Sequence, residues 1–249
     1  MIREKNNKQL TYAVFTNKGS REINEDSVGV FQNKSNIGCV LCDGLGGHGM
    51  GDVASSLVVD VFKDQFSKTD DMVNFLGQTF CAAQDILMAE QVRRGAKKKM
   101  KTTASAFVTD NRNVYIGHVG DSRVYVFHKN KVKKRTLDHS IPQMLVLARE
   151  IKEAEIRNHP ERNIVLRVLG IEWEEPMYEL LVPFHLKKGQ SFLLCSDGFW
   201  ELIEEKEMCV LLKKANNPNE WLMSMAEVVA SNGQGRNMDN YSAIAVWCR

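Results

Sequence analysis

Apolar residues recur along the chain with two different periods, which separate predicted helices from predicted strands. From 51 to 66 and from 71 to 93 they return every three or four positions, as on one face of a helix. Two further helices are expected near 204–214 and 219–231. Strands are predicted where apolar residues alternate or run together, at 10–16, 27–31, 37–42, 104–108, 114–116, 124–126, 177–183, 190–195 and 241–247.

The order of these elements predicts an α+β fold. The strands outnumber what one sheet usually holds, and the helices come in pairs rather than one after each strand. Two packed antiparallel sheets with helix pairs on the outside fit this order better than a parallel, doubly wound sheet. The polar segment 140–170 is expected to form short helices and loops, and a turn is expected near Lys129 and Asn130. Because no linker or repeat divides the chain, we expect residues 1–249 to form one domain.

Composition and charge exclude several classes of protein. A hydrophobic content of 43% is ample for a sizeable core. Lys and Arg number 33 against 31 Asp and Glu, a formal charge of +2, which argues against nucleic-acid binding through bulk charge. The polar start, residues 1–10, resembles no signal peptide, and no stretch approaches the ~20 apolar residues of a spanning helix. We therefore expect a cytoplasmic protein with no membrane and no nucleic-acid partner.

The six cysteines are predicted to be buried core residues of a reducing compartment. Cys39 and Cys42 have the C-x-x-C spacing, but a separation of three along a strand places the two thiols on opposite faces. No second pair completes a zinc site in the sequence. No cysteine is followed by arginine at the sixth position, so the loop of the thiolate phosphatases is missing as well.

Acidic residues stand at the ends of several predicted strands, where a metal site would need them. A carboxylate at the tip of a buried strand is costly unless a positive charge neutralises it, and a following glycine lets other backbone come close. A single Asp-Gly is more often an ordinary turn, but the repetition predicts a site for more than one hard divalent cation. The residues are Glu25, Asp26, Asp43, Gly44, Asp197 and Asp239.

The glycine-rich segment 44–49 matches the G-x-G-x-x-G pattern of dinucleotide sites. A nucleotide-binding enzyme is therefore an alternative, but a weak one. Asp43 would place a negative charge beside the pyrophosphate, and the next element after the first helix is a second helix, not a strand. The segment also has no Walker lysine. A turn that brings backbone carbonyls near a cation is the better interpretation.

Six short motifs occur along the chain in a fixed order. They are Arg21-Glu-Ile-Asn24-Glu25-Asp26-Ser27, Cys42-Asp43-Gly44-Leu-Gly-Gly-His48-Gly49, Gly120-Asp121-Ser122-Arg123, Asp138-His139-Ser140, Ser196-Asp197-Gly198-Phe199-Trp200 and Asp239-Asn240. This series strongly resembles the metal-dependent Ser/Thr protein phosphatases of the 2C type, in their compact bacterial form, over essentially the whole chain. The resemblance implies a four-layer αββα sandwich that hydrolyses phosphoserine and phosphothreonine in proteins, which we expect to be the substrates of a Ser/Thr kinase.

The resemblance also implies a centre of two Mn²⁺ or Mg²⁺ ions that activate a water for attack on phosphorus. Asp43 would bridge the two ions and the Gly44 carbonyl would help to hold one. Asp197 and Asp239 would hold the other. The residues implied to bind the metals directly or through water are Glu25 and Asp26.

Further roles are implied outside the two-metal centre. Arg21 falls where the family binds the substrate phosphate, a task that suits the paired donors of a guanidinium group. Asp121 matches the residue that holds a third, weaker ion in bacterial members. The segment 140–170 corresponds to the variable flap beside the site. The competing function is a catalytically silent pseudophosphatase, which the loss of a metal carboxylate would mark, and the sequence has lost none.

Three features depart from the family pattern. Asn17 stands where the family usually has Asp, and we expect a structural effect rather than the loss of a metal. Leu45 follows the first Asp-Gly, where some members have His, and His48 is interpreted as a core or loop residue. Basic residues crowd positions 93–101; this run is either a solvated loop or a basic lip that attracts acidic phosphorylated segments.

Overall fold

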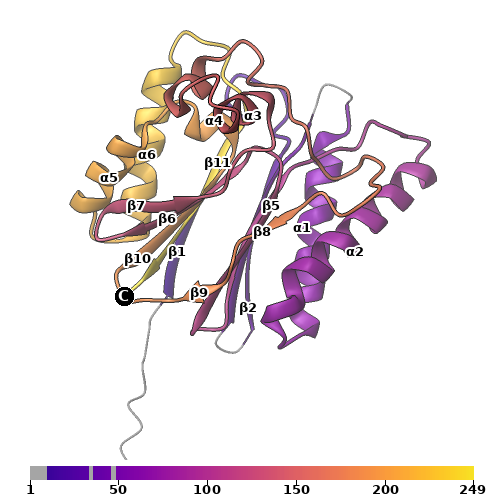
Figure 1. The fold of residues 1–249 in the computed structure, drawn as a ribbon, viewed down its shortest axis with the longest axis horizontal. Coiled ribbons are helices and arrows are strands. Elements are labelled where there is room, and N and C mark those ends of the chain that lie inside the picture. Colours follow the sequence, from indigo (N-terminus) through magenta and orange to yellow (C-terminus); the bar gives the residue numbers. More distant parts are fainter. Residues whose placement is uncertain (1–9, 34–35, 46–48) are drawn as a thin grey trace, which may run out of the picture.

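The computed structural model describes residues 10–33, 36–45 and 49–249, and its core is two antiparallel sheets packed face to face (Figure 1). The first sheet contains, in spatial order, β1 (Leu10–Asn17), β11 (Tyr241–Cys248), β10 (Gln190–Cys195), β6 (Arg123–His128) and β7 (Lys131–Arg135). The second contains β2 (Asp26–Asn33), β3 (Asn36–Asp43), β4 (Ala104–Thr109), β5 (Asn113–Val119) and β8 (Glu179–Leu180), and β9 (Phe184–His185) also pairs with β5.

Helix pairs cover the outer faces of both sheets, which confirms the expected four-layer αββα sandwich (Figure 1). The pair α1 (Gly51–Lys68) and α2 (Met72–Arg93) packs on the second sheet, and α5 (Glu205–Lys214) with α6 (Pro218–Gly233) packs on the first. The flap segment 140–170 contains short elements, as expected. They are α3 (Ile141–Leu147) and the 3₁₀ helix η2 (Glu153–Asn158). Another short helix, α4 (Asp197–Trp200), follows β10.

Three apolar layers hold the sandwich together, one between the sheets and one beneath each helix pair. Between the sheets, the rings of Phe107 and Phe192 lie 4.5 Å apart. Cys39 lies in this middle layer and Cys42 in the layer under α1 and α2, so the predicted opposite facing of the two thiols is confirmed. Cys81 and Cys209 are only partly buried, so the prediction that all six cysteines are core residues was wrong for these two.

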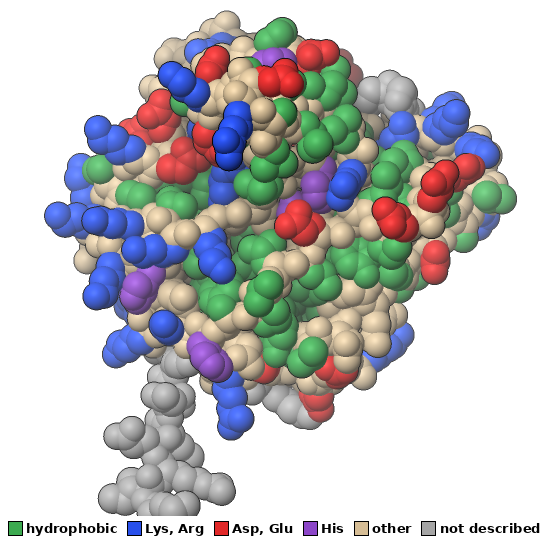
Figure 2. Space-filling view, viewed as in Figure 1, with side chains coloured by type: hydrophobic (Ala, Val, Ile, Leu, Met, Phe, Trp, Pro, Cys, Tyr) green, Lys and Arg blue, Asp and Glu red, His purple; other side chains and the backbone are tan. Residues whose placement is uncertain are grey.

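Two strand predictions differ from the structure. The pattern of apolar residues gives no sign of β7, because this strand forms a sheet edge whose lysines face solvent and protect the edge from pairing with another chain. Figure 2 shows Lys and Arg side chains gathered on this side of the molecule. Lys129 and Asn130, both with positive φ, make the expected turn between β6 and β7. The strand predicted at 177–183 is instead the short β8 and β9, separated by a segment that contains Pro183, which cannot donate to a ladder.

No helix among the residues that the structure describes is long and apolar enough to cross a membrane.

Candidate active site

The predicted acidic residues meet in one cavity, at the end of the sandwich where β3 finishes and β10 leads into α4. The pairing of β2 with β3 sets Asp26 opposite Asp43. The cavity has a volume of about 330 Å³. Of the predicted acidic residues, only Asp26 does not line the cavity, and it accepts a hydrogen bond from the Ser196 hydroxyl at 2.9 Å. The cavity is lined by Arg21, Glu25, Asp43, Gly44, Leu45, Asp121, Asn163, Val165, Asp197 and Asp239.

Backbone hydrogen bonds hold Asp43 in place at the end of β3. Its N–H donates to the Thr103 hydroxyl at 3.0 Å, and its carbonyl accepts from the Thr103 N–H at 2.8 Å. Gly44 follows because a Cβ atom there would lie 2.3 Å from the carbonyl oxygen of Gly51, the first residue of α1. The Gly51 N–H in turn donates to the Glu25 carboxylate. The close backbone approach expected at this glycine therefore joins α1 to the site.

Asp197 and Asp239 reach the cavity through a second close approach. Asp197 is the first residue of α4. A Cβ atom on Gly198 would lie 2.2 Å from the Asn240 carbonyl oxygen, so glycine is required for α4 to pack against the start of β11. The Asn240 side chain accepts from the Glu25 N–H at 2.8 Å and donates to the carbonyl of Ile23 at 3.0 Å. Asn240 thus fixes the loop that carries Arg21 and Glu25, a positioning role that the Asp-Asn motif alone did not indicate.

The aspartates are held close together with little positive charge to balance them. Burial, followed by neighbouring carboxylates, raises the pKa of Asp26 to about 7 and that of Asp197 to about 6. The same causes hold the pKa of Asp43 and Asp121 well above the ordinary value. The Asp26 Oδ1 atom has no hydrogen-bond partner among the described residues. A cluster of hard oxygen atoms that lacks positive charge is the environment that divalent cations require, so these residues fit the expected ions.

Arg21 lies at the rim of the cavity. Its Nη2 atom is 2.8 Å from Oδ2 of Asp239, and its side chain is 52% exposed. The rest of the guanidinium fork can therefore face an anion that enters the cavity. Asn17 accepts a hydrogen bond from the Gly19 N–H at 2.9 Å, which shapes the turn leading to Arg21. This contact gives Asn17 a structural role in the turn. His48 lies outside the residues that the structure describes.

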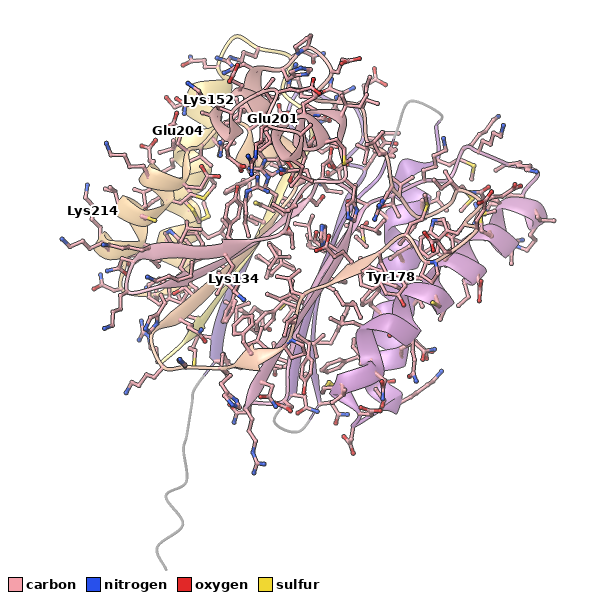
Figure 3. The ribbon with its side chains drawn as sticks, viewed as in Figure 1. Lys134, Lys152, Tyr178, Glu201, Glu204 and Lys214 are labelled. Atoms are coloured by element: carbon pink, nitrogen blue, oxygen red, sulfur yellow. The ribbon has the colours of Figure 1, made fainter. Side chains whose placement is uncertain are left out.

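The flap contributes residues that sequence reasoning missed. Asn163 and Val165 line the cavity, and the flap residue Arg162 holds Glu201 through a contact of 3.2 Å. Glu201 follows α4 at the same end of the molecule, as Figure 3 shows, and burial followed by the charge of Asp197 raises its pKa to about 7. None of these residues belongs to a recognisable motif, so no pattern in the sequence could have indicated them.

A buried ion pair next to the cavity holds Asp121 and α4 in position. Arg123 makes two hydrogen bonds to Asp138, at 2.8 and 2.6 Å, and both side chains are 1% exposed. The guanidinium carbon of Arg123 lies 3.4 Å from the centre of the Trp200 ring. The Trp200 indole N–H donates to the carbonyl of Asp121 at 3.0 Å. This chain of contacts fixes Asp121 relative to α4.

A second group of possible metal ligands lies nearby but fits a cation less well. The rings of His118 and His139 stack with centres 4.5 Å apart, and Glu179 lies 3.7 Å from Nε2 of His139. Nε2 of His118 is 2.7 Å from the Leu137 carbonyl, so it carries the proton, while Nδ1 of His139 accepts from the Gly120 N–H. The group thus offers one donor and two acceptors instead of three free ligand atoms, which suits a water molecule better than a metal ion.

Known proteins are similar to this chain in sequence and in fold. The chain is 34% identical over 207 residues to the serine/threonine phosphatase stp of Listeria monocytogenes serotype 4b (strain F2365), covering 80% of this chain and 81% of that protein. The sequence model of the family described as Protein phosphatase 2C matches residues 17–238. The chain therefore belongs to the protein phosphatase 2C family, and the phosphatase class expected from the sequence is confirmed.

Solved structures agree with this assignment. The crystal structure of the serine/threonine phosphatase Stp1 from Staphylococcus aureus has a TM-score of 0.88 at 30% identity, covering 97% of this chain and 96% of that one. The catalytic domain of the serine/threonine protein phosphatase PstP, crystallised in complex with two manganese ions, has a TM-score of 0.81 at 25% identity, covering 96% and 98%.

Proposed function

We propose that this phosphatase hydrolyses phosphoserine and phosphothreonine in proteins with the help of two divalent cations, Mn²⁺ or Mg²⁺, held by the carboxylate cluster. The observation that carries the proposal is the meeting of several aspartates with raised pKa values in one open cavity, with an exposed arginine at its rim. The names of the relatives, which are serine/threonine phosphatases, support the substrate class. The manganese complex of PstP supports the number and kind of ions.

The carboxylates divide into ligands and a supporting residue. Asp43, Asp197, Asp239 and the Gly44 carbonyl would hold the two ions, and Asp121 would hold a third, weaker one. The proposed remaining contacts, direct or through water, would come from Glu25 and Asp26. Because Asp26 does not line the cavity and is bonded to Ser196, contact through water suits it better.

Bound divalent cations would supply the chemistry by neutralising the carboxylates and by lowering the pKa of water, so that a hydroxide nucleophile exists near neutral pH. The chain's own residues do the rest. Arg21 donates to the phosphoryl oxygens and stabilises the charge that grows on them. Asp239 orients Arg21 through their 2.8 Å contact. Asn163 and Val165, which belong to the flap, line the cavity and limit the path by which the phosphorylated residue enters.

The test is hydrolysis of p-nitrophenyl phosphate and of a phosphothreonine peptide by the purified chain with Mn²⁺, and its loss in EDTA. Arg21→Ala should lower kcat/KM, by an amount equivalent to a loss of about 2–4 kcal/mol of transition-state stabilisation. The Mn²⁺ concentration that gives half-maximal activity should change little. Hydrolysis that persists in EDTA would contradict the proposal. Tight binding of the phosphopeptide without hydrolysis would identify the chain as a pseudophosphatase.

A further inference from the structure

A run of lysines stands beside the cavity in the loop between α2 and β4. We call Lys97, Lys98, Lys99 and Lys101 the basic platform. The carbonyl of Lys101 accepts a hydrogen bond from the N–H of Leu45 at 3.0 Å, and Leu45 lines the cavity. The platform is therefore attached to one wall of the active site. Figure 2 shows Lys and Arg side chains beyond the upper end of α2, at the corner where this loop runs in Figure 1.

The loop that carries the platform is held in a defined shape. Ala96 and Met100 are buried, at 3% and 0% exposure, and anchor the loop in the core under α2. The buried Gln91 side chain donates to the Met100 carbonyl at 2.8 Å and accepts from the Lys98 N–H at 3.1 Å. Because these anchors fix the backbone between them, the lysines are displayed at fixed positions, unlike those of a loose solvated loop.

The charges of the platform are largely unbalanced. Lys97 lies 3.1 Å from Glu172, but the side chains are 70% and 76% exposed, and such a pair is worth little in water. For Lys98, Lys99 and Lys101, no acidic side chain within ion-pair distance is found in the described part of the chain. Lys97, Lys98 and Lys101 also line a separate cavity of about 390 Å³ beside Gly170, where the flap segment ends. A peptide that leaves the active site on this side would pass the platform.

We propose that the basic platform binds Asp and Glu residues that lie a few positions away from the phosphorylated residue of a protein substrate, and so selects acidic phosphorylated segments. This inference rests on the proposed function. In the proposed function, the carboxylates that line the active-site cavity hold cations and the cavity takes the phosphate, so acidic residues beside the phosphate must find positive charge outside it. Lysines at its edge would favour encounter with such a segment and suppress encounter with a basic one.

The test compares phosphothreonine peptides that differ only in whether the residues beside the phosphothreonine are Glu or Gln. Glu is placed on the N-terminal side in one peptide and on the C-terminal side in another. The platform variant is Lys97→Gln, Lys98→Asn, Lys99→Gln and Lys101→Gln. Asn is chosen at position 98 because Lys98 has a φ of 68°, which Asn tolerates. A matched control removes four lysines from β7 and α5, of which Lys134 and Lys214 are labelled in Figure 3. The substitutions are Lys131→Gln, Lys133→Gln, Lys134→Gln and Lys214→Gln.

We expect the wild type at low salt to prefer at least one Glu peptide over the Gln peptide, and the platform variant to lose about tenfold in kcat/KM for that peptide. The loss should shrink to less than about twofold near 0.5 M salt, where exposed charges are screened within a few ångströms. The Gln peptide and p-nitrophenyl phosphate should change by less than about twofold, since the Gln peptide has no carboxylates for the lysines to attract and p-nitrophenyl phosphate is too small to reach them. Equal melting temperatures of wild type and variant in EDTA would exclude unfolding as the cause.

Three results would overturn the inference while leaving the phosphatase function intact. The first is equal hydrolysis of the Glu and Gln peptides by the wild type. The second is a platform variant that loses the same factor in kcat/KM for every substrate. The third is a matched control that loses as much kcat/KM for the Glu peptide as the platform variant does, which would mean that net charge alone matters. Failure of the wild type to hydrolyse any of the phosphopeptides with Mn²⁺ would instead contradict the proposed function itself.

Discussion

Two buried charge clusters lie next to each other at the same end of this protein, and they differ in how their charge is balanced. In the first, Arg123 binds Asp138 with two hydrogen bonds, donates to the Tyr125 hydroxyl and lies against Trp200. The Tyr125 hydroxyl donates to Glu205. Every charge in this network has an opposite charge or a hydrogen-bond partner supplied by the chain. The second cluster, the aspartates of the cavity, has no such internal partner for most of its charge.

The comparison separates stability from function. A buried charge whose partner belongs to the chain contributes to a fixed structure, and removing that partner leaves an uncompensated charge. Buried like charges without partners destabilise the fold until an ion from outside binds them. We therefore expect substitutions in the two clusters to have opposite effects on stability.

The largest expected effect is on activity, in the aspartate cluster. Asp43→Asn keeps shape but removes one charge and one ligand, and should lower kcat/KM by about 10³-fold or more. Its EDTA form should melt at or above the wild-type EDTA form, because repulsion is relieved, and Mn²⁺ should raise its melting temperature much less. A melting series of both proteins with EDTA and increasing Mn²⁺ measures this. If the variant is much less stable in EDTA yet gains the full Mn²⁺ shift, Asp43 is a structural residue.

The next effect is on stability, in the arginine network. Arg123→Met should lower the free energy of unfolding by about 3–5 kcal/mol, because Asp138 is left buried without a counter-charge. Urea unfolding in EDTA measures the loss, and Mn²⁺ should not restore it. The control is the double variant Arg123→Met with Asp138→Leu, which removes both charges and should recover much of the loss. A single variant as stable as wild type would show that the network is not a structural ion pair.

The smallest effect concerns pH and the histidines beside the network. Burial, followed by the charge of His118, lowers the pKa of His139 to about 3, so the folded protein keeps this ring neutral while the unfolded chain takes up a proton below about 6.5. The free energy of unfolding should therefore decrease as the pH falls, and His139 should contribute up to about 1.4 kcal/mol of this decrease per pH unit.

His139→Asn tests this because its side-chain oxygen can still accept the hydrogen bond of the Gly120 N–H. Between pH 7 and pH 5.5 the variant should lose about 1 kcal/mol less stability than the wild type, as measured by urea unfolding in EDTA at constant ionic strength. The carboxylates of the cavity contribute equally to both proteins and cancel in the difference. Parallel pH profiles would mean that folding does not lower the pKa of His139.

Sequence periodicity was sufficient for most of the fold and for two of the acidic residues that line the cavity, for a physical reason. Helices and central strands bury one face or both, so their apolar residues recur with the period of the backbone. Asp43 and Asp197 were recognisable because each ends an apolar run, where an unbalanced charge is unexpected. β7 was missed because an edge strand has its charged residues facing solvent and little to bury.

The contacts that position the site could not be predicted in this way. The stacking of Arg123 on Trp200, the placing of Glu201 by Arg162 and the bracing of the loop by Asn240 all join residues distant in sequence. Each uses residue types that are ordinary on a surface, and only the folded arrangement shows that they are partners.

The pairing of β1 with β11 has a consequence for how the protein is made. The Asn240 side chain donates to the carbonyl of Lys18, 222 positions away, and β11 lies between β1 and β10 in the first sheet. Contacts of such long range close large loops and form slowly. While the chain is being synthesised, the segments that carry Arg21 and Asp43 leave the ribosome long before β11 exists. The nascent chain therefore has no assembled cavity, and the active site cannot form until β11 has been inserted between β1 and β10.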